Sequence, residues 1–436
     1  MDKLSKYEQT AVIKNTDELA TTKLRKDALD ILEAGYRAIN TEKVVTSNIK
    51  VKDGHLFVKN RDINLSDYEN VFFIGIGKCS ADAAIVFEDI LGGYLSGGIV
   101  IDVRGVALQK IKSKVGTHPL PSEANIAAAE SVKELLESAT KRDLILTVIS
   151  GGGSALLCLP HDIQCAVMIQ TTETMIKSGA TIEEINTVRK HLSLIQGGQF
   201  AKLAYPAEIV SLIFSDVLGN DIETIASGPT VLDDTTREDA EKILAKYDIL
   251  NSCKLPDCEV LETPKDKKYF EKVENILLLT NKVALSAMKE KAEELGYRAI
   301  IVDDKIEGEA GIIGQLIASQ AKKETCLLYG GETTVVVNKG GKGGRSQDLV
   351  LGALPEMKED SVIIAAASDG WDNSYVAGAI GDKELFEKAQ SKGLDVNKFL
   401  VNNNSYDFFE EVGGHIKTGR TGSNILDLYF TLGNIT

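Results

Sequence analysis

The sequence predicts an α/β protein built from two domains, because of its alternating pattern, its strand composition and its length. Short runs rich in Val, Ile and Leu alternate with helical segments along almost all of the 436 residues. Continuous apolar strands followed by helices are typical of a parallel sheet that helices cover on both faces, which is the α/β architecture. At roughly 100–200 residues per domain, this length corresponds to two or three domains.

The expected strands and helices follow one another in order along the chain. Nine runs are predicted to be strands, at residues 71–77, 98–102, 143–150, 208–216, 275–280, 299–304, 324–331, 333–338 and 361–369. The clearest helical patterns are 122–141, where Ser122 is expected to be the N-cap, and 282–296. Each of these helices lies between two predicted strands, as a parallel connection requires.

A change of pattern marks the expected boundary region. Residues 250–275 hold two prolines and several charges and show little periodicity, which is typical of a surface connection near a domain boundary. We expect the first domain to span residues 1–235 as a Rossmann-like, doubly wound domain with a mostly parallel sheet. The second, residues 236–436, is expected to be an α/β domain with a mixed sheet.

The composition excludes several classes of protein. The net charge is −15 and no run of Lys or Arg forms a basic face, so no nucleic-acid partner is expected. No apolar stretch is long enough to predict a membrane span. The polar N-terminus lacks the apolar core of a signal peptide, so a cytoplasmic location is expected. No CxxC, HxxH or HxxxH spacing predicts a Cys/His metal site. A homo-oligomer is one option for the assembly.

The first candidate motif lies where the strand at 71–77 runs into a helix. Ligands of parallel sheets bind beyond the carboxyl ends of the strands, and Gly75, Gly77 and Lys78 stand at such an end. Glycines permit close backbone approach, and Lys78 adds a positive charge near a helix N-terminus, which favours an anion. The segment lacks the earlier glycine of a Walker A loop and the third glycine of GxGxxG. The alternative is an ordinary tight turn.

The second motif follows the next long apolar strand. Gly151, Gly152, Gly153 and Ser154 form a loop whose successive N–H groups suit a phosphate. Ser154 is also a candidate hydrolase nucleophile, but the GxSxG frame is missing and no histidine base is evident. Phosphate binding is therefore the favoured interpretation.

The third motif, 215-SDVLGNDIETIASGPT-230, places two carboxylates around a glycine turn. Asp216 and Asp221 are candidate Mg²⁺ ligands, because Mg²⁺ takes one or two carboxylates together with water and phosphate oxygens. The alternative is a solvated turn, in which Asp and Asn are common.

Two further motifs lie in the C-terminal half. The segment 339–348 is a cationic, glycine-rich loop in which Gly343 and Gly344 precede Arg345 at a helix start. Arg345 is suited to bidentate binding of carboxylate or phosphate, and a mobile hairpin tip is the alternative. In the second motif, Asp369 ends an apolar strand and is a candidate base, hydroxyl-orienting group or metal ligand, with a turn former as the alternative.

Two other polar segments carry weaker signals. Asp372, close after the strand at 361–369, is either a site residue or a turn former. Arg189, Lys190 and His191, in 186-NTVRKHLS-193, are interpreted as a solvated helix face.

Taken together, these motifs resemble one family. GIGK, THPLP, ISGGGSALL, NTVRKHLS, SDVLGNDIETIASGPT, GGETTV, GKGGRSQD, SDGWD and TGRTGSN occur in the order found in the glycerate 2-kinases that carry a MOFRL domain, and they span Gly75 to Asn424. The resemblance implies a two-domain α/β enzyme with a MOFRL-like C-terminal domain. It implies that ATP and Mg²⁺ serve the phosphorylation of a small hydroxy-acid, D-glycerate, to 2-phosphoglycerate.

The resemblance also assigns residues. The lysine of the family's first motif matches Lys78, the serine of its GGGSA loop matches Ser154, and its loop arginine matches Arg345. Its two loop aspartates match Asp216 and Asp221.

This sequence departs from the family pattern in two places. Ser346, Gln347 and Asp348 replace the usual Asn-Gln-Glu, and the stretch 373–376 is shorter and less acidic than usual. If these positions contact the substrate, a longer sugar acid is the alternative acceptor; an inactive homologue is disfavoured because Lys78, Arg345 and the aspartates are retained.

The mechanism expected for such a kinase is one of positioning and charge neutralisation. Mg²⁺ and the glycine-rich loops would hold the nucleotide phosphates. Lys78 and Arg345 would neutralise the acceptor carboxylate and the transferring phosphoryl group. Asp216 or Asp369 would orient or deprotonate the attacking hydroxyl.

Three other classes compete with a kinase. The first strand and GIGKCSADA also resemble sugar-isomerase-type phosphosugar-binding domains, which predicts an isomerase or a sugar-phosphate sensor without a nucleotide. A pure binding module would not need the paired acidic loop. In an NAD-dependent dehydrogenase Asp102 would hold the ribose, but the missing third glycine argues against it.

Overall fold

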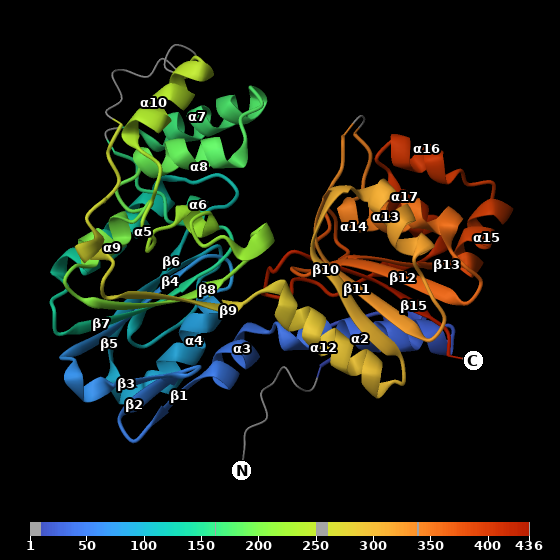
Figure 1. The fold of residues 1–436 in the computed structure, drawn as a ribbon, viewed down its shortest axis with the longest axis horizontal. Helices are drawn as coiled ribbons and strands as arrows, with labels where there is room; N and C mark the ends of the chain where they lie inside the picture. The colour runs from blue at the N-terminus through green and yellow to red at the C-terminus, as the bar shows by residue number, and fades with distance from the viewer. Residues whose placement is uncertain (1–9, 162, 250–259, 338–339, 436) are drawn as a thin grey trace. The chain divides into compact units, whose positions relative to one another are not determined.

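The computed structural model describes residues 10–161, 163–249, 260–337 and 340–435 (Figure 1). The chain forms two compact units, which we call the central unit (Val44–Leu278) and the flanking unit (Met1–Lys43 with Leu279–Thr436). The predicted boundary between residues 235 and 236 falls inside the central unit and stays a prediction. The predicted connection at 250–275 lies partly outside the described residues, at 250–259.

The central unit is built on a six-stranded sheet of order β6-β5-β4-β7-β8-β9. Its strands are β4 (Asn70–Ile76), β5 (Leu95–Asp102), β6 (Ile111–Val115), β7 (Asp143–Ile149), β8 (Glu208–Phe214) and β9 (Val273–Leu279). The pairs β4–β5, β4–β7, β5–β6 and β7–β8 are parallel, which confirms the prediction of a mostly parallel sheet. In chain order this sheet reads 3-2-1-4-5-6, the order of a dinucleotide-binding Rossmann fold, in which the direction of winding reverses between β4 and β7.

The central unit has one apolar cluster on its sheet and a separate one formed mainly by three of its helices. The helices are α4 (Ser80–Leu91), α5 (Glu123–Ser138), α6 (Gly153–Leu156), α7 (Cys165–Lys177), α8 (Ile182–His191), α9 (Gln199–Ala204) and α10 (Arg237–Lys246). The separate cluster is formed mainly by α7, α8 and α10. A capping box at Ser122 starts α5, as predicted. On α5, Ala128, Val132 and Leu136 are fully buried in the cluster that contains strand residues such as Ile101. Each such Val or Leu side chain contributes about 1.5–3 kcal/mol on burial.

Some strands of the central unit were not predicted. β1 (Ile49–Lys52), β2 (His55–Val58) and β3 (Arg61–Asn64) form a small antiparallel sheet of their own. β6 was also missed. These strands are only four or five residues long, and all of them except β2 carry Lys, Arg or Asp, so their apolar signal is weak.

The flanking unit contains a second six-stranded sheet, of order β10-β11-β15-β12-β13-β14. Its strands are β10 (Arg298–Glu309), β11 (Thr325–Thr334), β12 (Ser361–Ala367), β13 (Gly378–Asp382), β14 (His415–Ile416) and β15 (Asp427–Gly433). β10 and β11 are parallel and the other pairs are antiparallel, so the predicted mixed sheet is confirmed. The separate strand predicted at 333–338 is wrong: β11 continues to Thr334, residues 335–337 are irregular, and 338 lies outside the described residues.

Helices cover both faces of the second sheet. They are α1 (Thr16–Leu19), α2 (Lys23–Ala38), α12 (Asn281–Glu294), α13 (Ala310–Ser319), α14 (Arg345–Ala353), α15 (Lys383–Ser391), α16 (Val396–Val401) and α17 (Ser405–Val412). A further helix, α3 (Thr41–Asn48), spans the point in the sequence where the chain passes from the flanking unit into the central unit. Within the flanking unit α2 and α12 lie on one face of the sheet, and α13 and α14 on the other (Figure 1). No helix in the described part of the chain is long and apolar enough to cross a membrane.

Contacts between residues far apart in sequence hold α2 in the flanking unit. The guanidinium of Arg25 donates to both carboxylate oxygens of Asp382, at 2.5 and 2.7 Å. The hydroxyl of the buried Tyr36 donates to the carbonyl of Ala367 at 2.9 Å. The first helices therefore pack with the C-terminal half of the chain, which alternation of strands and helices does not predict.

Candidate active site

The first two predicted motifs meet at the carboxyl edge of the central sheet. The N–H of Ser150, after β7, donates to the carbonyl of Ile76 at 2.9 Å, and the N–H of Lys78, after β4, donates to the carbonyl of Gly151 at 3.0 Å. The two loops are thus hydrogen-bonded at the point where the winding of the sheet reverses, the usual place for a ligand in this kind of sheet.

Three glycines allow these loops to approach each other and the third motif. A Cβ on Gly77, whose φ is +118°, would lie 2.1 Å from Ser150 Oγ. A Cβ on Gly151 would lie 2.0 Å from Asp216 Oδ2, so the carboxylate of Asp216 contacts the backbone of residues 151–154 directly. We call residues 151–154 the glycine loop. A Cβ on Gly153 would lie 2.5 Å from the Cβ of Ala226. No other amino acid fits at these three positions without displacing its neighbour.

Lys78 lies beside this loop with its charge available. A Cβ on Gly152 would contact Lys78 Cε at 3.2 Å and His118 Cδ2 at 3.0 Å, so all three residues are neighbours. Among the described residues no carboxylate lies within ion-pair distance of the Lys78 ammonium. Burial and the positive charge of Lys78 lower the pKa of His118 to about 4, so this imidazole is neutral at pH 7.

The two aspartates of the third motif differ. Both carboxylate oxygens of Asp221 accept local hydrogen bonds, from the Glu223 N–H at 3.0 Å and the Thr224 hydroxyl at 2.7 Å. Asp221 therefore shapes its own turn, whereas Asp216 faces the glycine loop. In the part of the chain that the structure describes, no group of three or more His, Cys, Asp and Glu is placed to hold a metal ion. One carboxylate is enough for Mg²⁺ when phosphate oxygens and water supply the other ligands, and Asp216 fits that need.

The hydroxyl of Ser154 is hydrogen-bonded to another serine hydroxyl. Its Oγ lies 3.0 Å from Ser227 Oγ. The backbone there is unusual, because Ala226 and Ser227 have φ of +53° and +59°, a conformation that residues with a side chain rarely adopt. Such strain persists where the surroundings enforce it, and it is concentrated at functional sites. The contact with a second serine does not provide the base that a nucleophile requires.

The interpretation of Arg189, Lys190 and His191 as a solvated face is wrong. Lys190 and His191 are 6% and 0% exposed, and the Lys190 ammonium lies 3.2 Å from Asp233 Oδ1 inside the protein. Arg189 is partly buried, and desolvation lowers the pKa of its guanidinium. Residue type alone cannot reveal this, because α8 carries charged residues on a face that α10 covers in the fold.

Two other residues named from the sequence have structural roles. Gly75 lies within β4, where its missing side chain admits Val100 and Ser80, and its contact with a cofactor stays a prediction. The buried carboxylate of Asp102 accepts from the N–H groups of Ala81 and Val103, at 2.9 and 2.6 Å. Asp102 therefore caps the start of α4, and a ribose-binding role for it is not supported.

A second group of predicted residues lies in the flanking unit, at the start of α14. The guanidinium of Arg345 donates to Asp427 Oδ2 at 2.5 Å and Oδ1 at 3.2 Å, and it also pairs with Glu332. Although burial alone would lower the pKa of Arg345, these two carboxylates raise it. Neither Asp427 nor Glu332 was selected as a site residue from the sequence.

Asp372, rather than Asp369, supports this helix start. The carboxylate of Asp372 accepts from the N–H groups of Ser346 and Gln347 at 3.0 and 2.9 Å, and from Gln347 Nε2 at 2.8 Å. A Cβ on Gly344 would lie 2.3 Å from Asp372 Oδ1, which explains the glycine before α14. Asp369 accepts from the N–H of Trp371 at 2.9 Å and so forms a turn after β12.

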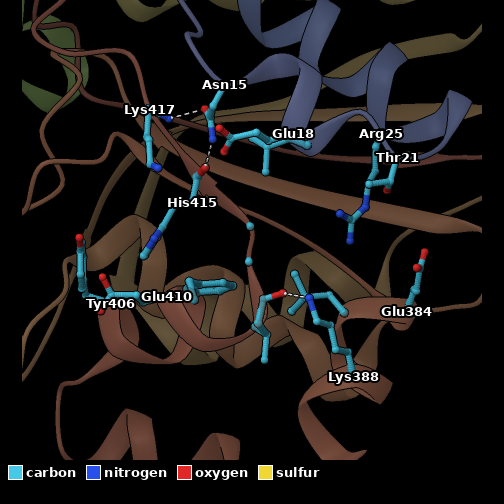
Figure 2. Close-up of a pocket in the computed structure, with 16 residues that line it drawn as sticks. Asn15, Glu18, Thr21, Arg25, Glu384, Lys388, Tyr406, Glu410, His415 and Lys417 are labelled. Carbon is cyan, nitrogen blue, oxygen red and sulfur yellow. Dashed lines mark hydrogen bonds between the residues drawn. The ribbon is translucent and has the colours of Figure 1, made fainter. Parts of the chain in front are cut away.

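These groups border a cavity of about 650 Å³ in the flanking unit. Its lining includes Gly343, Gly344, Arg345, Asp348, Trp371 and Asp372. A second cavity of the same unit, about 390 Å³, contains none of the predicted site residues (Figure 2). There the side chain of Asn15 bonds to the backbone of His415 and Lys417, and Lys388 bonds to a carbonyl, so its polar groups mainly tie segments together.

The chain is similar to known proteins over most of its length. A domain of unknown function (DUF4147) matches residues 27–261, and the MOFRL family matches residues 325–427. A glycerate 2-kinase of Pyrococcus horikoshii is 38% identical over 91% of this chain and 96% of its own length. A D-glycerate 2-kinase of Thermotoga maritima is 33% identical over 94% and 98%. The crystal structure of a glycerate kinase from Thermotoga maritima matches with a TM-score of 0.83 and 32% identity, covering 94% of this chain and 99% of that one.

Proposed function

This chain belongs to the glycerate kinase family, and from that premise we propose that it transfers the γ-phosphoryl group of ATP to the 2-hydroxyl of D-glycerate, giving 2-phosphoglycerate. The observation that carries the proposal is the meeting of Lys78, the glycine loop and Asp216 at the carboxyl edge of the central sheet. Phosphoryl transfer needs positioned positive charge and N–H donors more than covalent chemistry, and this edge supplies both.

The glycine loop is the proposed seat of the nucleotide phosphates. Among the described residues, the N–H groups of Gly151 and Gly152 have no acceptor, and Lys78 lies against Gly152. Successive free N–H groups beside an ammonium form a concave anion site. Because the loop is tied to β4 through the Lys78 N–H and the Gly151 carbonyl, little reorganisation is needed when charge develops on the transferring group.

Asp216 is the proposed protein ligand of Mg²⁺. When bound, this ion would neutralise the charge of the β- and γ-phosphate oxygens. Asp221 was also a candidate ligand, but its carboxylate oxygens already serve the turn, so we assign the role to Asp216. Asp369 remains a candidate for orienting the acceptor hydroxyl, and one of its oxygens accepts from the Trp371 N–H.

We propose that Arg345 also serves this reaction, although its positive charge is already paired with two carboxylates. Its guanidinium is held by Asp427 on one edge and by Glu332 on another. Because two carboxylates already hold this cation, we propose that Arg345 positions the loop that ends in Gly344 rather than binding an anion by itself.

The identity of the acceptor acid depends on where the residues that depart from the family pattern lie. Ser346 and Asp348, the two departures within residues 346–348, are almost fully buried, although Asp348 belongs to the lining of the cavity described above. Asn373 and Tyr375 are the exposed departures, and the side-chain amide of Asn373 donates to the Gly343 carbonyl at 2.9 Å. A changed acceptor would therefore be recognised through Asn373 and Tyr375.

A coupled ADP-release assay with ATP, Mg²⁺ and a panel of sugar acids tests the proposal. We expect release with D-glycerate. Release only with a longer acid would keep the kinase and change its acceptor. If no acid of the panel gives ADP, the kinase assignment is wrong, and binding of sugar phosphates becomes the next hypothesis to measure.

A further inference from the structure

Arg189 differs from every other arginine of the central unit. The unit contains five arginines, and among the described residues four of them pair with a carboxylate: Arg61 with Glu208, Arg104 with Asp82, Arg142 with Glu69, and Arg237 with Glu241. The guanidinium of Arg189 instead donates to an uncharged amide, Asn186 Oδ1, at 3.2 Å. Within the described chain no carboxylate lies in ion-pair range of it.

The lack of an anionic partner is costly at this position. Arg189 is partly buried, and desolvation lowers the pKa of its guanidinium. A buried charge is normally paired, because the loss of hydration has to be offset by an opposite charge or by several hydrogen bonds. The C-terminal end of a helix stabilises a cation by only about 0.3–1 kcal/mol in most settings, so the position of Arg189 in the last turn of α8 offsets little of this cost.

A chain of polar contacts connects Arg189 to the glycine loop. Asn186 Oδ1, which accepts from Arg189, also accepts from the hydroxyl of Ser227 at 3.4 Å. Ser227 in turn lies 3.0 Å from the hydroxyl of Ser154, the last residue of the loop. Asn186 and Ser227 are 6% and 0% exposed, so this connection runs through the protein interior.

The backbone on this path is held in a strained conformation. Ser227 has φ of +59° and the preceding Ala226 has φ of +53°. Ala226 is pressed against Gly153, which accepts it only because it has no Cβ. The fold therefore maintains a strained turn that places the Ser227 hydroxyl between Ser154 and Asn186.

We infer that Arg189 binds an anionic oxygen of the reactants at the Ser154 side of the glycine loop. This oxygen belongs either to the carboxylate of the acceptor acid or to a phosphate of the nucleotide. The inference rests on the proposed kinase function. Lys78 approaches the loop from Gly152, so Arg189 supplies a second cation near its other end. Two separate cations suit a site that must neutralise both a carboxylate and a phosphate chain.

Steady-state kinetics of Arg189→Ala and Arg189→Lys, made in the full chain, distinguish the two sources. Loss of one hydrogen-bonded charge pair is expected to raise the KM of the reactant concerned by about 10–100-fold. A rise for D-glycerate alone assigns the carboxylate, and a rise for ATP alone assigns the phosphate. Added guanidinium is expected to restore part of the activity of Arg189→Ala, which a purely structural role does not predict.

Arg237→Ala is the matched control, because Arg237 lies in the same unit and pairs with Glu241 on the surface of α10. Its KM values should equal those of the wild type. Normal KM values for both reactants in a folded Arg189→Ala protein would overturn the inference.

A second measurement keeps the inference separate from the kinase assignment. Inorganic phosphate and D-glycerate, each added alone, are expected to raise the melting temperature of the wild type, and at least one of these shifts should vanish in Arg189→Lys. If the wild type releases no ADP but the shift still depends on Arg189, only the proposed function fails. If both ligands shift the variant and the wild type equally, Arg189 does not bind the anion.

Discussion

Two glycine-rich loops, one in each unit, carry a cation, and they differ in what that cation touches. In the central unit Lys78 has no carboxylate within ion-pair range among the described residues, and its neighbours are Gly152 and His118. In the flanking unit Arg345 is held by Asp427 and Glu332. Both loops look alike in sequence, yet among the described residues the Lys78 ammonium has no carboxylate partner, whereas the Arg345 guanidinium has two. The composition of a loop therefore indicates an anion site only when the partners of its cation are known.

The strongest test of this comparison is the stability of the flanking unit. Arg345→Ala should lower the free energy of unfolding by up to about 3–5 kcal/mol, because Asp427, with a side chain only 2% exposed, would be left as an unpaired buried charge. Chemical denaturation measures this loss.

Two companion variants make the result interpretable. Arg345→Ala combined with Asp427→Asn should recover most of the stability, since the orphaned charge is removed as well. Arg37→Ala, which breaks a more exposed pair with Glu33, should cost no more than about 1 kcal/mol. Equal losses for Arg345→Ala and Arg37→Ala would show that the Arg345 charge is not held by its carboxylates.

In the central unit, loss of the Lys78 charge should lower the reaction rate rather than the free energy of unfolding. Lys78→Ala is expected to lower kcat by about 10²–10³-fold, the usual effect of losing one preorganised electrostatic donor. Its free energy of unfolding should change little, because the ammonium has no ion-pair partner to lose among the described residues. Lys177→Ala, at an exposed helical pair, serves as the control. Turnover of Lys78→Ala close to that of the wild type would remove Lys78 from the mechanism.

A smaller change tests how Asp216 is positioned. In Gly151→Ala the new Cβ would lie 2.0 Å from Asp216 Oδ2, so the carboxylate must move. Misplacement of a positioned group by about 1 Å costs about 10²-fold in rate. Gly93→Ala is the matched control, because no atom lies within 4 Å of its Cβ. If Gly151→Ala has normal kinetics with Mg²⁺, then Asp216 does not take part.

The loops of the central unit were predictable because the physics that places them is local. Apolar strands such as β4 and β7 are evident in the sequence, and the carboxyl ends of parallel strands share one edge, so the loops that contain Lys78 and Gly151 had to be neighbours. The likeness to one family in the order of its motifs then indicated which ligand such an edge would take.

The partners of these residues were not predictable, because they come from distant parts of the chain. Asp427 stands 82 residues after Arg345 and reaches it because β15 enters the middle of the second sheet. Arg25 contacts Asp382 across 357 residues. Arg189 looked like a surface residue because the packing that covers α8 is tertiary. Sequence pattern thus identified the candidate cations, but whether each charge is available depends on contacts that no local pattern records.

The smallest expected effect concerns His118, whose pKa responds to the positive charge of Lys78. Burial and, after it, the charge of Lys78 lower the pKa of His118 from 6.5 to about 4. In Lys78→Met, which keeps the side-chain stem without the charge, we expect this pKa to rise only part of the way back, because burial is unchanged. An NMR titration resolves the signal readily, since the chain has five histidines.

The sign of the linked stability effect follows from the same shift. Because the folded pKa lies below that of the unfolded chain, the unfolded state binds a proton first as the pH falls from about 6.5 towards 4, and the native state loses stability over that range. His118→Asn should flatten this part of the pH–stability curve, and Lys78→Met should flatten it less. An unchanged His118 pKa in Lys78→Met would mean that the Lys78 charge does not act at the glycine loop. The difference between the two units would then disappear, and the kinase proposal would lose that support.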